Sequence, residues 1–207
     1  MRMSELGRSR LVALGAAILV MLVVIGAATW FLLTPATRSM AGGEALVGGP
    51  FTLTDQHGAA VTEQDFAGRY MLIYFGYTYC PDFCPMSLSD MTQALDLLPP
   101  EQAEQVVPIL ITVDPERDTV EQLAEYAPLF HPRLVALTGT PEQTRQAAKA
   151  YRVYFSKAGN GDGSDYLMDH STFIYLMGPD GKYVRHFRHA ATPEEIAAGI
   201  AAAIAEA

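Results

Sequence analysis

Cysteine is nearly absent from this chain: its 207 residues include two, Cys80 and Cys84, with three residues between them. A structural disulfide normally closes a long loop, because the chain entropy that it removes grows with loop length. A disulfide across so short a ring would stabilise the fold little, so we expect the pair to serve chemistry. Two thiols this close together either oxidise to a disulfide or share a soft metal ion.

Basic residues are also scarce, with 14 Lys and Arg against 23 Asp and Glu, and the formal net charge is −9. Residues 1–38 carry four arginines and one glutamate, a charge of +3, so residues 39–207 carry −12. An acidic domain of this kind is not expected to bind nucleic acid or to adhere to anionic lipid. The negative surface indicates mainly solubility, although it would tolerate a basic partner or a metal cation.

Residues 11–33 lack charge altogether. As a helix they would span about 34 Å, enough to cross a hydrocarbon core of about 30 Å. Three arginines precede the run and only Arg38 follows it closely, so the positive-inside bias places the N-terminus in the cytoplasm. We therefore predict four segments: a cytoplasmic N-terminus over residues 1–10, a transmembrane anchor over 11–33, a linker over 34–45 and an extracytoplasmic domain over 46–207.

A cleaved signal peptide is the alternative for the same run, with a poor cleavage site at residues 39–41. The run is too long for the apolar core of such a peptide, which covers about 7–15 residues, so we favour an uncleaved anchor. The residues before the run do not resemble an Arg- and Ser-rich mitochondrial presequence. The predicted location is a bacterial plasma (inner) membrane, with the domain on its periplasmic or extracytoplasmic side.

The rest of the chain alternates between strand-like and helix-like segments. Apolar runs typical of buried strands cover residues 70–75, 106–112 and 134–137, and helical patterns start near Met86, Val120, Thr140 and Pro193. Residues 169–177 place His170 on a loop at the mouth of a further buried strand. This alternation predicts an α/β layer with partly parallel strands. A cysteine pair between the first long central strand and its helix is the thioredoxin-like arrangement, although the usual redox motif has about two residues between its cysteines.

The helix after the cysteines has a clear apolar face. Leu88, Met91, Leu95 and Leu98 recur at three- and four-residue intervals, which predicts that this face is buried. Met86 is assigned to the core as well, in preference to a role as a thioether ligand. Free N–H groups and the dipole at the start of the helix would favour a thiolate over a thiol.

Three blocks of sequence carry a family resemblance. They are Tyr74-Phe-Gly-Tyr-Thr-Tyr-Cys80-Pro-Asp-Phe-Cys84-Pro85, Val113-Asp-Pro-Glu-Arg-Asp-Thr119 and Asp169-His-Ser-Thr-Phe-Ile-Tyr-Leu176. In this order they resemble the Sco (SenC) copper-binding proteins, and the similarity covers about residues 46–205. The resemblance implies a thioredoxin-like domain held by one N-terminal helix, with copper bound by Cys80, Cys84 and His170.

The family's usual role implies a membrane-anchored copper metallochaperone. Such a protein delivers copper to, or reduces the cysteines of, the binuclear copper site in subunit II of cytochrome c oxidase. Another cuproprotein as recipient, a thioredoxin-like reductant and an upstream copper donor are further expected partners. The donor set suits this cargo, because thiolates select Cu(I) and imidazole accepts either copper state. Zinc fits these three residues less well, since a closed structural zinc site has about four ligands.

A thiol–disulfide oxidoreductase is the main alternative. In that case Cys80 or Cys84 attacks a partner disulfide and the other cysteine resolves the mixed disulfide. Metal binding requires His170 and disulfide exchange does not, so this residue separates the two hypotheses. A passive membrane-tethered scaffold would need neither cysteine. Any enzymatic activity is expected to be disulfide exchange, because a peroxidase has only an accessible thiol in its favour.

Several side chains near these positions are given supporting roles. Tyr77 and Tyr79 are predicted to wall the site and limit access of water. Asp169 would either orient the neighbouring imidazole or serve as a turn or cap residue. Asp114 and Asp118 are expected to cap the helix that follows them.

Overall fold

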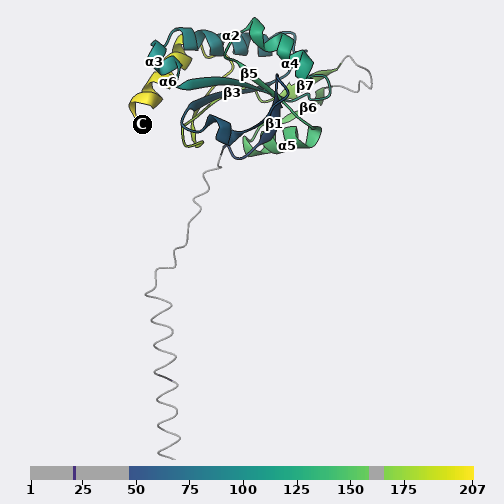
Figure 1. The fold of residues 1–207 in the computed structure, drawn as a ribbon, viewed down its shortest axis with the longest axis horizontal. Coiled ribbons are helices and arrows are strands. Elements are labelled where there is room, and N and C mark those ends of the chain that lie inside the picture. Colours follow the sequence, from purple (N-terminus) through teal and green to yellow (C-terminus); the bar gives the residue numbers. More distant parts are fainter. Residues whose placement is uncertain (1–20, 22–46, 159–165) are drawn as a thin grey trace, which may run out of the picture. The chain divides into compact units, whose positions relative to one another are not determined.

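The computed structural model describes Met21, residues 47–158 and residues 166–207 (Figure 1). The predicted cytoplasmic segment, transmembrane anchor and linker therefore lie outside the described residues, apart from Met21. Within the part of the chain that is described, no helix combines the length and the apolar character needed to cross a bilayer.

Two apolar runs form the centre of a seven-stranded sheet. β3 (Tyr70–Gly76) and β4 (Val106–Thr112) are parallel neighbours, and every residue of both strands is buried. Strands buried on both faces have continuous apolar sequences, which is the pattern that predicts these two. The strand order is β2-β1-β5-β4-β3-β8-β9, and the other strands are β1 (Thr52–Asp55), β2 (Ala60–Thr62), β5 (Val135–Thr138), β8 (Ile174–Met177) and β9 (Tyr183–Phe187).

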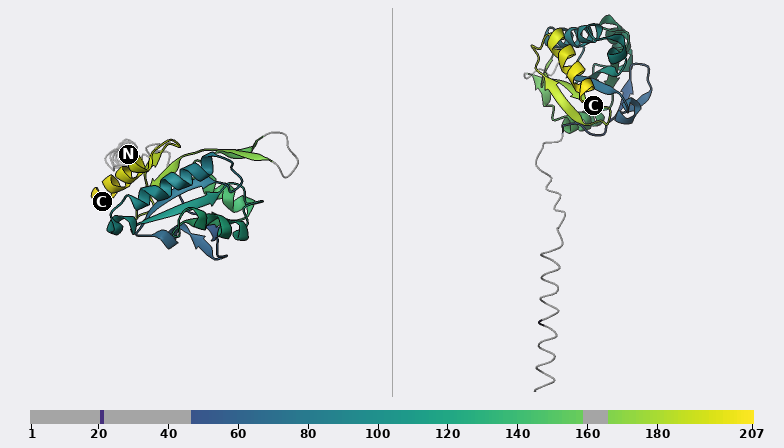
Figure 2. Two further views of the ribbon diagram at one scale, coloured as in Figure 1. Left: turned by 90° about the horizontal axis from the view of Figure 1, so that it is seen from above. Right: turned by 90° about the vertical axis from the view of Figure 1, so that its left-hand side faces the viewer.

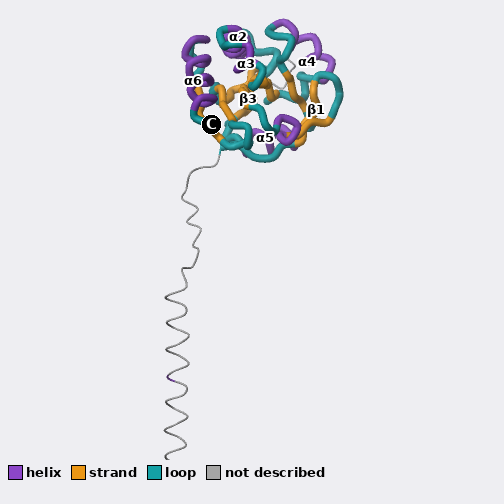
Figure 3. Tube along the Cα trace, turned by 60° about the vertical axis from the view of Figure 1, so that its left-hand side comes forward, coloured by secondary structure: helices purple, strands orange, loops and turns teal. Residues whose placement is uncertain are grey.

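The sheet is mixed, as the alternation of segments predicts. β5 runs parallel to β4, whereas β8 runs antiparallel to β3 and β9 antiparallel to β8. Figure 1 shows α2 and α4 on one face of the sheet and α5 on the other, and Figure 3 shows the strands enclosed between helices. The helices are α2 (Phe83–Asp96), α3 (Pro100–Ala103), α4 (Val120–Tyr126), α5 (Pro141–Ala150) and α6 (Pro193–Ala205), with 3-10 turns η1 (Glu63–Phe66) and η2 (Ala127–Leu129).

Helix α2 begins three residues before the position where its apolar pattern starts. Leu88, Met91 and Leu95 are buried, and so is Leu98 just beyond the helix, which confirms the predicted core face. The assignment of Met86 to the core is wrong, because its side chain is 51% exposed. Met86 lies two residues before Leu88, so it points about 200° away from it around the helix.

The parallel pairing of β3 and β4 brings two connections together. The register runs from Tyr70 opposite Val106 to Gly76 opposite Thr112, so both strands end at the same edge of the sheet. The Val113 N–H donates to the Gly76 carbonyl at 2.8 Å, just beyond that edge. The loop that carries the cysteines therefore starts beside the loop that leads from β4 to α4.

A two-stranded arm stands apart from the main sheet. It consists of β6 (Phe155–Ala158) and β7 (Leu167–His170), antiparallel, with Phe155 opposite His170. In the left view of Figure 2 the arm, in light green, extends beyond the main sheet. The buried strand predicted beyond His170 is confirmed, because β8 begins at Ile174 and is buried throughout. His170 itself ends β7, so the loop predicted to carry it is a strand end.

Candidate metal and redox site

The two cysteines lie on the turn between β3 and α2, as predicted. Cys80 is partly buried in the turn, Cys84 is fully buried in the first turn of α2, and both thiols are free. The Cys84 N–H donates to the Cys80 Sγ at 3.3 Å. One of the unpaired N–H groups of the helix N-terminus thus points at sulfur, which stabilises a thiolate there.

Glycine is required at the end of β3 because the site comes very close to it. A Cβ atom at Gly76 would lie 2.7 Å from Cε1 of Tyr74 and 3.1 Å from the Cys84 Sγ. Both of those side chains are fully buried, so neither can move aside easily. The Cys84 sulfur is thus packed directly on the backbone of β3.

His170 comes from the end of β7 to the buried cysteine. Its Nε2 lies 3.4 Å from the Cys84 Sγ, and its Nδ1 lies 2.9 Å from the Ser171 carbonyl oxygen. A carbonyl can only accept, so Nδ1 carries the proton and Nε2 offers its lone pair to the cysteine side. The structure thus brings Cys84 and His170 together across 86 positions of sequence.

The role predicted for Asp169 is wrong as far as the imidazole is concerned. The hydrogen-bond partner of the His170 Nδ1 is the Ser171 carbonyl, and not the Asp169 carboxylate. Side chains alternate along a strand, so His170 and Met168 share one face of β7 and Asp169 points to the other. Asp169 is accordingly exposed, whereas Met168 is buried.

Two buried tyrosines surround the imidazole. The ring of Tyr74 meets that of His170 edge to face at 6.0 Å between centroids, and Tyr77 does so at 5.9 Å. The Tyr77 hydroxyl also accepts from the Met168 N–H at 3.1 Å, which attaches β7 to the cysteine loop. Tyr77 therefore walls the site as predicted.

The two other tyrosines of this region depart from the prediction. Tyr79 is 52% exposed and lies against Arg117, so its assignment to the wall is wrong. Tyr74, whose hydroxyl lies 3.8 Å from the Cys84 Sγ, was not predicted as part of the site. Residues two apart on a strand share a face, so Tyr74 lies on the same face of β3 as Gly76. This alternation is the sequence signal that could have identified Tyr74.

The two thiols differ in acidity. A hydrogen bond from the Cys84 thiol lowers the pKa of Cys80 to about 3, with smaller contributions from the Asp82 and Cys84 N–H groups. The same bond to Cys80, together with burial, raises the pKa of Cys84. Cys80 is therefore the thiolate of the pair and Cys84 the thiol, an assignment that the sequence leaves open.

This difference predicts selective alkylation. With iodoacetamide, native protein is expected to be modified at Cys80 and to remain unmodified at Cys84. Because the thiolate of Cys80 is already formed, the rate of alkylation at Cys80 should change less than about twofold between about pH 5 and pH 8. Peptide mapping by mass spectrometry measures both sites. A rate at Cys80 that rises about tenfold per pH unit, as for an ordinary thiol of pKa about 8.5, would contradict the assignment.

The carboxylates after β4 do not cap α4 as predicted. The N-cap is Thr119, whose hydroxyl accepts from the Gln122 N–H. Asp118 is fully buried and accepts hydrogen bonds from the Thr78 N–H, the Thr78 hydroxyl and the Thr112 hydroxyl. Burial raises the pKa of Asp118, and these hydrogen bonds oppose that rise. No sequence pattern would have shown this link to the loop of Cys80.

The remaining histidines have other partners. His57 is exposed in the turn between β1 and β2, and His131 lies 3.9 Å from Asp96. The Nδ1 of His186 is 2.6 Å from the Tyr183 hydroxyl, and that of His189 is 3.2 Å from the Ser87 hydroxyl. These contacts account for His131, His186 and His189 without a metal, and exposure in a turn does so for His57.

The thiols of Cys80 and Cys84 and the imidazole of His170 are chemically suited to bind a soft metal ion. Among the described residues, no three His, Cys, Asp or Glu side chains form a ready-made metal cage. The 3.4 Å between the Cys84 Sγ and the His170 Nε2 nevertheless suits two ligands of one ion. Bonds of about 2.3 Å to sulfur and about 2.0 Å to nitrogen, as in zinc sites, place two such atoms roughly 3.5 Å apart at a tetrahedral angle.

Comparison with known proteins gives a consistent result. The SCO1/SenC family model matches residues 39–205. The mitochondrial SCO1 homologue of Homo sapiens is 45% identical over 160 residues, which are 77% of this chain and 53% of that protein. The chain thus spans about half the length of this relative.

Solved structures agree with the same family. The crystal structure of Arabidopsis thaliana ScoI with copper bound has a TM-score of 0.72 and 41% identity, covering 78% of this chain and 99% of that one. BsSco, described as having a disulfide switch and as a member of the Sco family of cytochrome c oxidase assembly proteins, has a TM-score of 0.60 and 27% identity, covering 76% and 94%.

Proposed function

The chain belongs to the SCO1/SenC family, and from this premise we propose that it binds copper through Cys80, Cys84 and His170. The observation that supports this most is the approach of the His170 Nε2 to within 3.4 Å of the Cys84 Sγ, beside the second cysteine. Two sulfurs and one imidazole form a soft set of donors that holds Cu(I) and tolerates Cu(II). Copper is the cargo of such a protein.

Each donor is prepared differently by the chain. Cys80 is already a thiolate at neutral pH, because its pKa is lowered by the bond from Cys84. Cys84 is a buried thiol and must lose its proton when a metal ion binds, so uptake releases that proton. The Ser171 carbonyl holds the Nδ1 proton of His170 and leaves the Nε2 lone pair available. Tyr74 and Tyr77 limit water around these atoms.

We further propose that the protein serves the assembly of cytochrome c oxidase as a membrane-anchored metallochaperone. The anchor would be residues 11–33 in a bacterial plasma membrane, with the domain on the extracytoplasmic side. The recipient would be the binuclear copper site of subunit II of the oxidase, or another cuproprotein. The description of BsSco as a member of a family of oxidase assembly proteins supports this role.

Thiol–disulfide exchange is a second candidate function, favoured by the asymmetry of the cysteines. The partly exposed Cys80 thiolate would attack one sulfur of a partner disulfide and release the other as a thiolate. Cys84, after losing its proton, would attack the Cys80 sulfur and release the partner as a dithiol. The chain would then hold a Cys80–Cys84 disulfide, and a thioredoxin-like reductant would have to supply two electrons to restore it.

Copper titration of the full chain in detergent tests the first function. The reduced protein is expected to bind about one Cu(I) per chain under anaerobic conditions, and about one Cu(II). Protein alkylated at Cys80 is the control, and it should lose binding of both ions. A reduced, folded protein that binds neither ion in the micromolar range would contradict the proposal, and disulfide exchange would then be the remaining function.

A further inference from the structure

The turn of residues 114–118, between β4 and α4, holds no proposed metal ligand, yet it contacts both the loop that leads to Cys80 and the arm that carries His170. Towards the cysteine loop, Asp118 accepts from the Thr78 N–H at 3.1 Å and from the Thr78 hydroxyl at 2.6 Å. Thr78 lies two residues before Cys80. A third bond, from the Thr112 hydroxyl at 2.6 Å, fixes Asp118 to the end of β4. The start of the cysteine loop is thereby attached to the rigid centre of the sheet.

On the side of the arm, the contacts of the turn are made by Asp114 and Arg117. Asp114 is buried, forms an ion pair with Arg117 and accepts from the Tyr166 hydroxyl at 2.7 Å. The Arg117 guanidinium lies 3.7 Å from the ring centroid of Tyr166 and 4.7 Å from that of Tyr79. Tyr166 directly precedes β7, and Tyr79 directly precedes Cys80. One guanidinium thus lies between the two segments that bear the proposed ligands.

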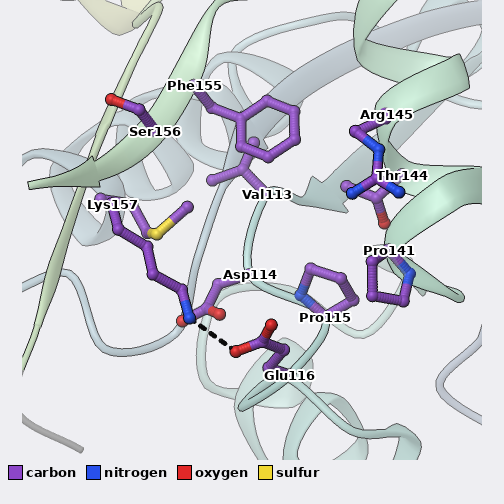
Figure 4. A pocket seen from close by; sticks show the side chains of 11 residues that line it. Val113, Asp114, Pro115, Glu116, Pro141, Thr144, Arg145, Phe155, Ser156 and Lys157 are labelled. Carbon is purple, nitrogen blue, oxygen red and sulfur yellow. Dashed lines mark hydrogen bonds and ion pairs between the residues drawn. The ribbon is translucent and has the colours of Figure 1, made fainter. Parts of the chain in front are cut away.

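A further contact attaches the other strand of the arm. Lys157 of β6 forms an ion pair with Glu116 at 2.7 Å, as Figure 4 shows, and its Nζ lies 4.3 Å from the Tyr166 ring centroid. A cavity of about 150 Å³ lies between the turn, α5 and the arm. The arm is outside the main sheet, and tight packing does not hold it on this side. On this side the arm is held by the polar and cation–π contacts of the turn, which add to the bond between the Met168 N–H and the Tyr77 hydroxyl.

We propose that the turn of residues 114–118 is the positioning element of the site, in which Asp118 fixes the cysteine loop and Arg117, with Asp114, fixes the arm that carries His170. Together they set the separation of the Cys84 sulfur and the His170 imidazole. The inference rests on the proposed function in that it takes Cys80, Cys84 and His170 as the working residues. It assigns a role to the second of the three sequence blocks, which contributes no ligand.

Arg117→Lys tests the arm side of this element in copper-free, full-length protein. Lysine keeps the positive charge but loses the planar stack on the two tyrosine rings. With histidine and tyrosine isotopically labelled, NMR is expected to show that the cross-peaks between His170 and the rings of Tyr74 and Tyr77 fall by at least about half, and that the Nε2 shift of His170 moves. Cu(II) affinity is expected to fall about tenfold, a loss between that of an exposed and that of a fully desolvated cation–π contact.

Arg145→Lys is the matched control. Arg145 lines the same cavity and pairs with Glu142 at 2.9 Å, but it is 59% exposed and comes from α5. This variant should leave both the NMR cross-peaks and copper affinity unchanged. If Arg117→Lys also leaves the His170 cross-peaks and the Nε2 shift unchanged, the positioning role is refuted, whatever the metal does.

A double-mutant cycle separates positioning from general loss of stability. In a His170→Ala background, Arg117→Lys should change Cu(II) affinity less than about twofold, because the residue acts through the imidazole. An equal loss in both backgrounds would overturn the inference. If His170→Ala alone leaves copper affinity intact, the proposed metal site fails, and the NMR comparison still decides whether the turn positions His170.

Asp118→Asn tests the loop side. The amide keeps one acceptor oxygen, turns the other into a donor and loses the charge, which weakens the bond to the Thr78 N–H. This N–H should exchange with solvent at least about tenfold faster, as expected when a charged hydrogen bond is lost. Asp55→Asn is the control, since the Asp55 carboxylate also accepts from backbone N–H groups, those of His57 and Ala59, but in the distant β1–β2 turn. Unchanged exchange at Thr78 would refute the role of Asp118.

Discussion

His170→Ala is expected to separate copper binding from disulfide exchange in one protein. Cu(II) affinity should fall at least about a hundredfold, because loss of a ligand exceeds the 10–100-fold cost known for groups that merely orient ligands. The rate at which the reduced protein cleaves glutathione disulfide should change less than about threefold, since the attacking atom is the Cys80 sulfur and the Cys84 thiol is the main cause of its low pKa. Competition titration with a copper chelator and a stopped-flow thiol assay measure the two properties.

His186→Ala is the control for this experiment. His186 is an exposed histidine whose Nδ1 pairs with the Tyr183 hydroxyl at 2.6 Å, in a strand of the main sheet. It should keep both properties. A His170→Ala protein with full copper affinity would remove His170 from the ligand set and leave disulfide exchange as the better function. Loss of both properties, with the fold intact, would show that the imidazole activates the thiols as well.

The sequence predicts the elements that bury continuous apolar surface. β3 and β4 are buried throughout, so their apolar runs define them without any knowledge of their partners. The start of α5 is also local, because Thr140, Pro141 and Gln143 form its cap within four residues. The position of the cysteines on a strand-to-helix turn follows from these two kinds of signal, and it is correct.

The arm and its contacts could not be predicted in the same way. β6 has a mixed burial pattern, so its sequence has neither an apolar run nor a strict alternation. The contact of His170 with Cys84 joins residues 86 positions apart, and local patterns do not determine such a distance. It was proposed from the family resemblance and from the place of His170 at the mouth of a buried strand. Asp118 was assigned to a cap because acidic residues before a helix usually serve one, whereas here tertiary burial decides its partners.

Replacing Cys84 with serine is expected to trap a covalent intermediate that Cys80→Ser cannot form. In the wild-type chain, attack by Cys80 on glutathione disulfide forms a mixed disulfide and releases one glutathione thiolate. Cys84 then displaces the second glutathione. Serine is not a leaving or attacking group for disulfides at neutral pH, so in Cys84→Ser the adduct on Cys80 should persist. Mass spectrometry of the intact protein should find nearly all chains carrying glutathione.

The matched substitution at the other cysteine makes the result decisive. Cys80→Ser keeps only the buried thiol, whose pKa is raised and whose side chain has no exposed surface, so it should form adduct at least about a hundredfold more slowly. Both variants should lose Cu(I) binding, because each retains a single thiolate. The copper result therefore cannot distinguish the cysteines, and the adduct can. If Cys80→Ser accumulates the adduct and Cys84→Ser does not, the buried cysteine is the attacking one, and α2 must open at its first turn to expose it.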